Sequence, residues 1–134
     1  MTVVFMLASA SIMFLLGAVH LAYTFVGPKL TPRDDELKHA MARVSPVITR
    51  ETTMWNAWLG FNASHSLGAM LFGLVFGYLS LKGQPLLFQA DFLPCVGLIM
   101  LCGYVVLGKL YWFRIPFIGI LLALLCFIAS MLTR

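Results

Sequence analysis

The polar side chains that could do chemistry lie mainly in one otherwise apolar segment, residues 53–68, which reads T-M-W-N-A-W-L-G-F-N-A-S-H-S-L-G. Steps of three and four residues return to the same side of a helix, so the spacing predicts one polar and aromatic face. The members of this face are Trp55, Trp58, Asn62, His65, Ser66 and Ala69. Polar side chains in an apolar helix need partners and seldom face lipid, so we expect this face to point into a helical bundle.

A second histidine lies near the end of an earlier apolar segment, where His20 shares a helical face with Thr24 and is close to Tyr23. Counting from the connection between the two segments places His20 roughly 9 to 10 Å deep, and Asn62 and His65 roughly 13 to 18 Å deep. Because the two helices are directly connected, we expect them to be neighbours that form one polar pocket. The predicted members of this pocket are His20, Tyr23, Thr24, Trp55, Trp58, Asn62, His65 and Ser66.

Two interpretations of this cluster stay open at the level of the sequence. Apolar walls with a few convergent polar groups are what a small-molecule site requires. Alternatively, Asn, His and Ser hydrogen-bond across membrane helices with an average stabilisation of about 0.6 kcal/mol and do nothing else.

Metal and haem binding are not predicted, although two histidines on opposing helices can ligate haem iron. His20 and His65 are expected to differ in depth by a turn or more, and all five acidic residues lie in connections. A zinc or dimetal centre would therefore lack a third ligand near the histidines.

Enzymatic and transport functions are alternatives to a binding function. Histidine can act as a general acid or base near neutral pH, so His20 or His65 could serve a small membrane enzyme. The sequence has no Ser-His-Asp arrangement, H-E-x-x-H motif or Gly-rich phosphate loop to support catalysis, and an enzyme is not favoured. Coupled transporters usually place an acid within the membrane, whereas the nearest acid here, Asp91, is expected to stabilise the start of a helix.

The composition indicates an integral membrane protein. Of 134 residues, 61% are hydrophobic and only 10% are charged, whereas a soluble domain is nearer half apolar and a quarter charged. A chain of this length forms one domain, 1–134, and cannot bury so many apolar side chains in a soluble core. The net charge of +4 follows from basic residues in short connections, so it indicates membrane topology and not nucleic-acid binding.

Four segments are long enough to cross a bilayer as helices, because a hydrocarbon core of about 30 Å needs about 20 residues. They are 3–26, 53–81, 92–110 and 115–132. A chain with four such segments cannot close a β-barrel, so an all-α, four-helix membrane bundle is predicted. The connections on one side carry seven basic residues, whereas the other side has only Lys82 and the terminal Arg134. The positive-inside rule then places both termini outside and the connection 27–52 in the cytoplasm.

The connection 27–52 is expected to contain a short amphipathic helix, 32–44, that lies along the membrane interface. Thr31 is the predicted N-cap and Pro32 the first helical residue. An apolar stripe of Leu37, Met41 and Val44 recurs at helical spacing. A solvated linker helix without lipid contact is the alternative.

The segment T-T-M-W-N-A-W-L-G-F-N-A-S-H-S-L-G, together with H-L-A-Y-T-F at the end of the first span, resembles small four-helix bacterial membrane proteins of uncharacterised function. The resemblance covers most of the chain and implies a bacterial inner membrane. It implies no activity, cofactor or site residue. The leading functional hypothesis is an accessory subunit of a membrane assembly or a binder of a lipid- or quinone-like molecule. Small residues along the fourth span, which permit close helix packing, and the polar cluster without catalytic partners motivate it. Its expected partners are the lipid bilayer, other membrane subunits or a hydrophobic small molecule.

Overall fold

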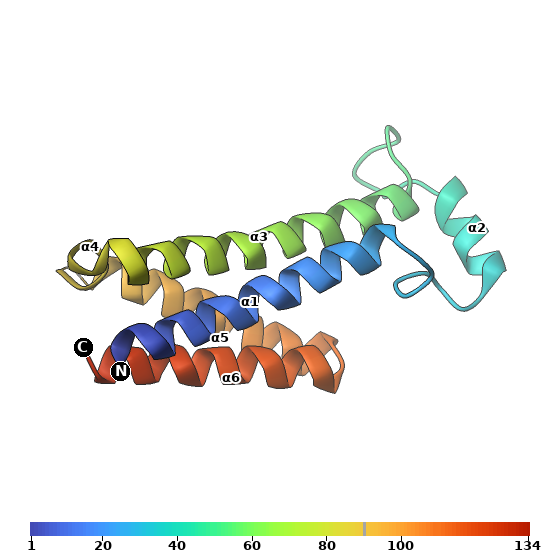
Figure 1. Cartoon of the computed structure of the whole chain (residues 1–134). Coiled ribbons are helices and arrows are strands. Elements are labelled where there is room, and N and C mark those ends of the chain that lie inside the picture. The colour runs from blue at the N-terminus through green and yellow to red at the C-terminus, as the bar shows by residue number, and fades with distance from the viewer. Residues whose placement is uncertain (90) are drawn as a thin grey trace. The chain divides into compact units, whose positions relative to one another are not determined.

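The structure, a computed structural model, describes residues 1–89 and 91–134, and all regular elements in these ranges are helices (Figure 1). In chain order they are α1 (Thr2–Phe25), α2 (Asp35–Arg43), α3 (Met54–Lys82), α4 (Gln84–Gln89), α5 (Phe92–Tyr111) and α6 (Arg114–Leu132).

Four of these helices, α1, α3, α5 and α6, are long and apolar enough to cross a membrane. Their bounds agree with the four predicted spans to within one residue at each end. The shortest, α6, has 19 residues and therefore a length of about 28 Å. The prediction of four long apolar helices is thus confirmed.

The end of α1 follows from the Gly27-Pro28 pair. Gly27 adopts a φ of 78°, a left-handed conformation that glycine accepts at little cost and that commonly terminates helices. Proline then lacks the N–H that a continuing helix would need. The chain therefore leaves the helix just after Phe25.

The helix in the first connection is shorter than predicted, because its N-cap is Asp34 and not Thr31. The Asp34 carboxylate accepts hydrogen bonds from the backbone N–H groups of Glu36, at 2.9 Å, and Leu37, at 3.4 Å. The Thr31 hydroxyl instead donates to the carbonyl oxygen of Pro28 in a preceding turn. The predicted helix 32–44 is therefore corrected to Asp35–Arg43. The short helix α4 was not predicted.

Contacts along the chain define two compact units. The first comprises Met1–Leu16 and Ala69–Arg134, and the second comprises Gly17–Gly68. Both α1 and α3 contribute one part to each unit. The buried apolar core lies in the first unit, and its members are Met6, Ala10, Met13, Ala69, Phe72, Phe76, Leu87, Leu101, Ile120, Ala123 and Phe127.

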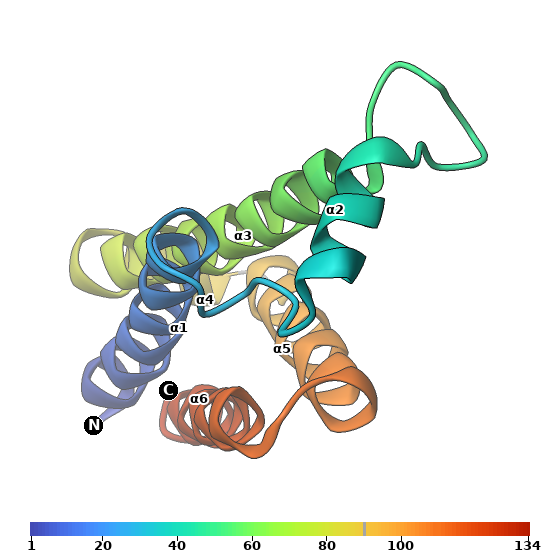
Figure 2. The ribbon, with the colours of Figure 1, turned by 90° about the vertical axis from the view of Figure 1, so that its right-hand side faces the viewer.

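Within the first unit, α5 and α6 form an antiparallel hairpin, and the two chain termini lie close together (Figures 1 and 2). The Thr2 hydroxyl donates to the carbonyl oxygen of Thr133, and Arg134 forms a 2.9 Å ion pair with Asp91. These contacts join the start of α1 to the end of α6 and the end of the chain to the start of α5.

Close approach of helices in the first unit depends on two glycines. A Cβ on Gly73 of α3 would lie 2.6 Å from the carbonyl oxygen of Ala10 in α1. A Cβ on Gly97 of α5 would lie 2.5 Å from the ring of Phe127 and 2.6 Å from the ring of Phe76. Glycine at these positions therefore makes room for a neighbouring backbone in one case and for two aromatic rings in the other.

Candidate functional site

All eight residues of the predicted polar pocket lie in the second unit. Three of them come from the last part of α1, and five come from the first part of α3. The α1 residues are His20, Tyr23 and Thr24, and the α3 residues are Trp55, Trp58, Asn62, His65 and Ser66. We refer to His20, Asn62 and His65 as the polar cluster, because the His20 side chain contacts the side chains of the other two.

The cluster is centred on a hydrogen bond between the two helices. His20 Nε2 and Asn62 Oδ1 are 2.9 Å apart. The Asn62 amide nitrogen also donates to the carbonyl oxygen of Trp58, one turn earlier in α3, at 2.8 Å. Because a carbonyl oxygen can only accept, this second bond fixes which end of the Asn62 amide faces His20. The predicted proximity of the two helices is therefore realised at this level of the second unit.

The same geometry assigns the hydrogen-bonding roles of the two ring nitrogens of His20. Asn62 Oδ1 can only accept a hydrogen bond, so the proton between the two residues belongs to His20 Nε2. In the neutral imidazole, Nδ1 then carries a lone pair and is an acceptor. Among the described residues, Nδ1 has no hydrogen-bond partner.

His65 is adjacent to His20. The two ring centroids are 5.4 Å apart, and the rings meet edge to face at an interplanar angle of 77°. Both side chains are partly buried. Two imidazoles from different helices, expected to lie at different depths, are thus brought into direct ring contact.

The hydroxyl groups near the cluster act within their own helices. Ser66 donates to the carbonyl oxygen of Asn62, and Thr24 donates to the carbonyl oxygen of His20, both at 2.8 Å. Both residues are buried. Their protons are therefore used by the backbone one turn earlier, which leaves the histidines and Asn62 as the side chains that reach between helices.

The aromatic residues predicted to bound the pocket contact the first connection. Trp58 Nε1 donates to the carbonyl oxygen of Leu30 at 3.0 Å. The ammonium group of Lys38 lies 5.6 Å from the ring centroid of Trp55, and that of Lys29 lies 5.8 Å from the ring centroid of Tyr23. Such cation–π contacts stabilise a local arrangement by about 0.5–1 kcal/mol at exposed sites.

The role of Leu30 has no signal in the sequence, because a backbone carbonyl carries no residue-specific mark. The interaction depends on how the connection lies against the start of α3. The hydrogen bond to the Leu30 carbonyl satisfies the indole N–H of Trp58 near the start of α3.

Metal-ligating side chains do not converge in the described part of the chain. No group of three or more His, Cys, Asp or Glu residues there is arranged to hold a metal ion. The three cysteines are free thiols.

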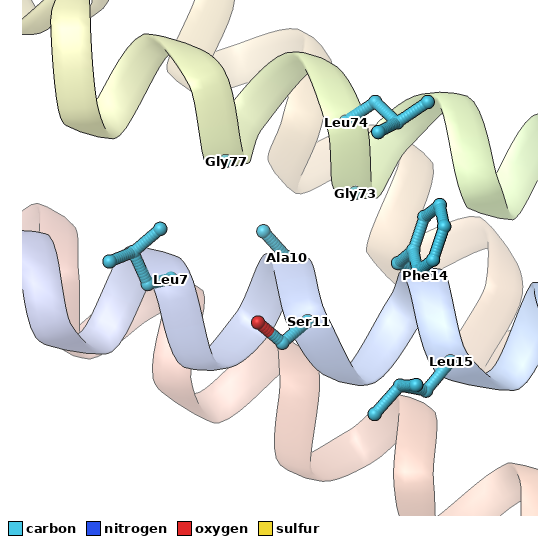
Figure 3. A pocket seen from close by; sticks show the side chains of 8 residues that line it. All are labelled: Leu7, Ala10, Ser11, Phe14, Leu15, Gly73, Leu74 and Gly77. Carbon is cyan, nitrogen blue, oxygen red and sulfur yellow. The ribbon is translucent and has the colours of Figure 1, made fainter.

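A separate apolar groove of about 290 Å³ lies in the first unit, between α1 and α3 (Figure 3). It is lined by Leu7, Ala10, Ser11, Phe14, Leu15, Gly73, Leu74 and Gly77. A Cβ on Gly77 would lie 3.7 Å from Cβ of Ala10, an ordinary contact, whereas a Cβ on Gly73 would lie 2.6 Å from the carbonyl oxygen of Ala10. The groove contains no ionisable side chain, so it offers shape and apolar surface but no acid–base chemistry.

No protein-family model, curated protein or solved structure matches the chain.

Proposed function

We propose that the protein is an integral membrane protein with four spans, α1, α3, α5 and α6. The exposed face of α6 supports this proposal, because it presents Ile118, Leu122 and Leu125, each at least half exposed. The opposite face is buried through Phe127 and Ser130. A helix that is apolar on both its buried and its exposed face is suited to lipid.

The distribution of basic residues supports an orientation with both termini outside and the connection 27–52 in the cytoplasm. The resemblance to small four-helix bacterial membrane proteins supports a bacterial inner membrane. In this orientation α2 lies along the cytoplasmic interface. This helix has no buried residue. It has a polar face, and the side chain of Leu37 is exposed, as in helices that lie at a membrane interface.

We further propose that the polar cluster binds a lipid- or quinone-like molecule. The observation that carries this proposal is the acceptor at His20 Nδ1, which is fixed by the hydrogen bond to Asn62 and lies beside His65. The lone pair of His20 Nδ1 lies between two apolar helices. It therefore favours an apolar ligand that carries a hydroxyl group as hydrogen-bond donor. The hydroxyl of a quinol or of a lipid headgroup has this chemistry.

A direct test uses decylubiquinol and decylubiquinone with the full chain in nanodiscs, under anaerobic conditions. Tryptophan fluorescence reports binding, because Trp58 lies one turn from Asn62. We expect saturable quenching in which the quinol binds more tightly than the quinone. His20→Ala should weaken quinol binding by about tenfold, the value of one hydrogen bond of about 1.4 kcal/mol.

His39→Ala is the matched control, because His39 is an exposed histidine in the same unit but lies on α2. It should leave binding unchanged. Equal quenching by both redox forms and by both variants would show membrane partitioning without a site, and would refute the proposal. Native mass spectrometry after mild extraction provides a second measurement, in which a bare monomer would also contradict it.

The ring contact between His20 and His65 favours one alternative, a membrane enzyme that uses one of these histidines as acid or base. In that case His65→Ala would abolish turnover of a bound quinol-like substrate and leave the free energy of unfolding nearly unchanged. If the unmodified chain has no turnover and His65→Ala greatly lowers the free energy of unfolding, the cluster serves helix packing instead. Participation as an accessory subunit of a larger assembly stays a prediction.

A further inference from the structure

Residues 44–54 comprise the connection from α2 to α3 and the first residue of α3, and they form a loop closed at its base. The backbone N–H of Met54 donates to the carbonyl oxygen of Val44 at 2.8 Å. Inside the loop, the N–H of Thr49 donates to the carbonyl oxygen of Pro46 at 3.3 Å, which defines a turn. The Thr49 hydroxyl then accepts from the N–H of Glu51 at 3.1 Å. These bonds give the segment a defined shape with a single tip.

The tip consists of two aliphatic side chains. Val47 and Ile48 occupy the central positions of the turn, and their relative exposures are 109% and 91%. Turns at protein surfaces usually carry Gly, Asn, Asp or Ser at such positions. A β-branched pair held fully outward therefore favours an apolar environment outside the unit.

Basic side chains flank this tip. Arg43 ends α2 just before the loop, and Arg50 follows the turn, and both are exposed. Glu51 is the only acidic residue between them and α3. Positive charge beside an exposed apolar tip complements the anionic lipid headgroups that cover an apolar layer.

The loop extends sideways from the first turn of α3 and does not continue along the axis of that helix. Figure 1 shows the loop on one side of the first turn of α3. If α3 crosses the bilayer, a loop that leaves its end sideways runs along the membrane surface. The tip is then at the level where lipid headgroups meet acyl chains.

We propose that residues 44–54 form a lipid-binding wedge, in which Val47 and Ile48 insert between anionic headgroups and Arg43 and Arg50 contact the phosphates. This inference rests on the proposed membrane insertion of α3 and is independent of the ligand of the polar cluster. It assigns the loop to the bilayer and not to a partner protein.

The test places a fluorescent label at single positions of the full chain, with Cys95, Cys102 and Cys126 replaced by serine. Val47→Cys is labelled with an NBD fluorophore after reconstitution into vesicles of phosphatidylcholine with phosphatidylglycerol. We expect a blue-shifted emission and quenching by lipids with a spin label near the headgroup. Glu36→Cys, on the polar side of α2, is the control and should emit as in water.

Phe61→Cys separates the wedge from membrane insertion, because Phe61 is 75% exposed on α3. A label there should be quenched by spin labels deep in the acyl chains. If position 61 is deep while position 47 emits as in water, the loop does not enter lipid and the wedge is refuted; such a result would point to a protein partner. If position 61 also emits as in water, the insertion of α3 fails, and the wedge fails with it.

The contribution of Arg43 and Arg50 to lipid binding is measured separately. Arg43→Gln with Arg50→Gln should reduce headgroup quenching at position 47 about twofold or more in vesicles with phosphatidylglycerol. The same pair should have little effect in phosphatidylcholine alone. Equal quenching in both lipids, before and after the substitutions, would overturn the role of the two arginines.

Discussion

Replacing Gly73 by alanine should destabilise the protein, because α1 and α3 are in backbone contact there within the first unit. The added Cβ would lie 2.6 Å from the carbonyl oxygen of Ala10 and 2.6 Å from Cβ of Phe14, whereas ordinary contacts begin at 3.4 Å. The two helices would have to separate by about 0.8 Å, the difference between these distances. A helix carbonyl cannot rotate away as a flexible side chain can.

The size of the effect follows from a comparison with Gly60→Ala in the same helix. No atom lies within 4 Å of a Cβ built on Gly60, so this variant changes only helix propensity, by up to about 1 kcal/mol in favour of alanine. Gly73→Ala has the same propensity term and adds overpacking, which costs about 1–3 kcal/mol. The free energies of unfolding of the two variants should therefore differ by about 1–3 kcal/mol.

Unfolding of the full chain by sodium dodecyl sulfate in mixed micelles, followed by circular dichroism, measures this difference. We expect Gly60→Ala to be at least as stable as the unmodified chain and Gly73→Ala to be less stable than both. Identical free energies of unfolding for the two variants would refute the close contact between α1 and α3.

Four further predictions concern single side chains. Gly97→Ala should have a free energy of unfolding about 1–3 kcal/mol below that of Gly103→Ala, because its Cβ would contact two phenylalanine rings, whereas no atom lies within 4 Å of a Cβ on Gly103. Ser9→Ala should leave stability unchanged or raise it, because this buried hydroxyl has no hydrogen-bond partner among the described residues; a loss above about 1 kcal/mol would contradict this. Asp34→Ala should remove the N-cap and cost α2 about 1 kcal/mol, seen as faster hydrogen exchange confined to that helix. Trp58→Phe should lose the bond to the Leu30 carbonyl, worth about 0.5–1.5 kcal/mol, and increase proteolysis of the connection.

The bounds of the long helices could be predicted because their causes are local. Each long helix follows from apolar composition over about 20 residues, and the end of α1 follows from the Gly27-Pro28 pair. These causes act between neighbouring residues, so the sequence alone determined where the long helices begin and end. The shared face of Asn62, His65 and Ser66 also follows from helical periodicity. The start of α2 could not be predicted in the same way, because both Thr31 and Asp34 are acceptable N-caps. Asp34 is selected because its carboxylate reaches the free N–H groups of the first turn.

Only the tertiary structure decided how the polar side chains pair. Spacing placed His20 and His65 on expected inner faces, but the 2.9 Å bond to Asn62 and the ring contact depend on how far one helix is shifted along the other. A shift of one residue would move a side chain by about 1.5 Å and turn it away from its partner. Tertiary structure also determines the acceptor at His20 Nδ1 and the hydrogen bond from Trp58 to the Leu30 carbonyl. The sequence thus determined which residues could take part in a site, and the register between α1 and α3 in the second unit determined the chemistry that they present.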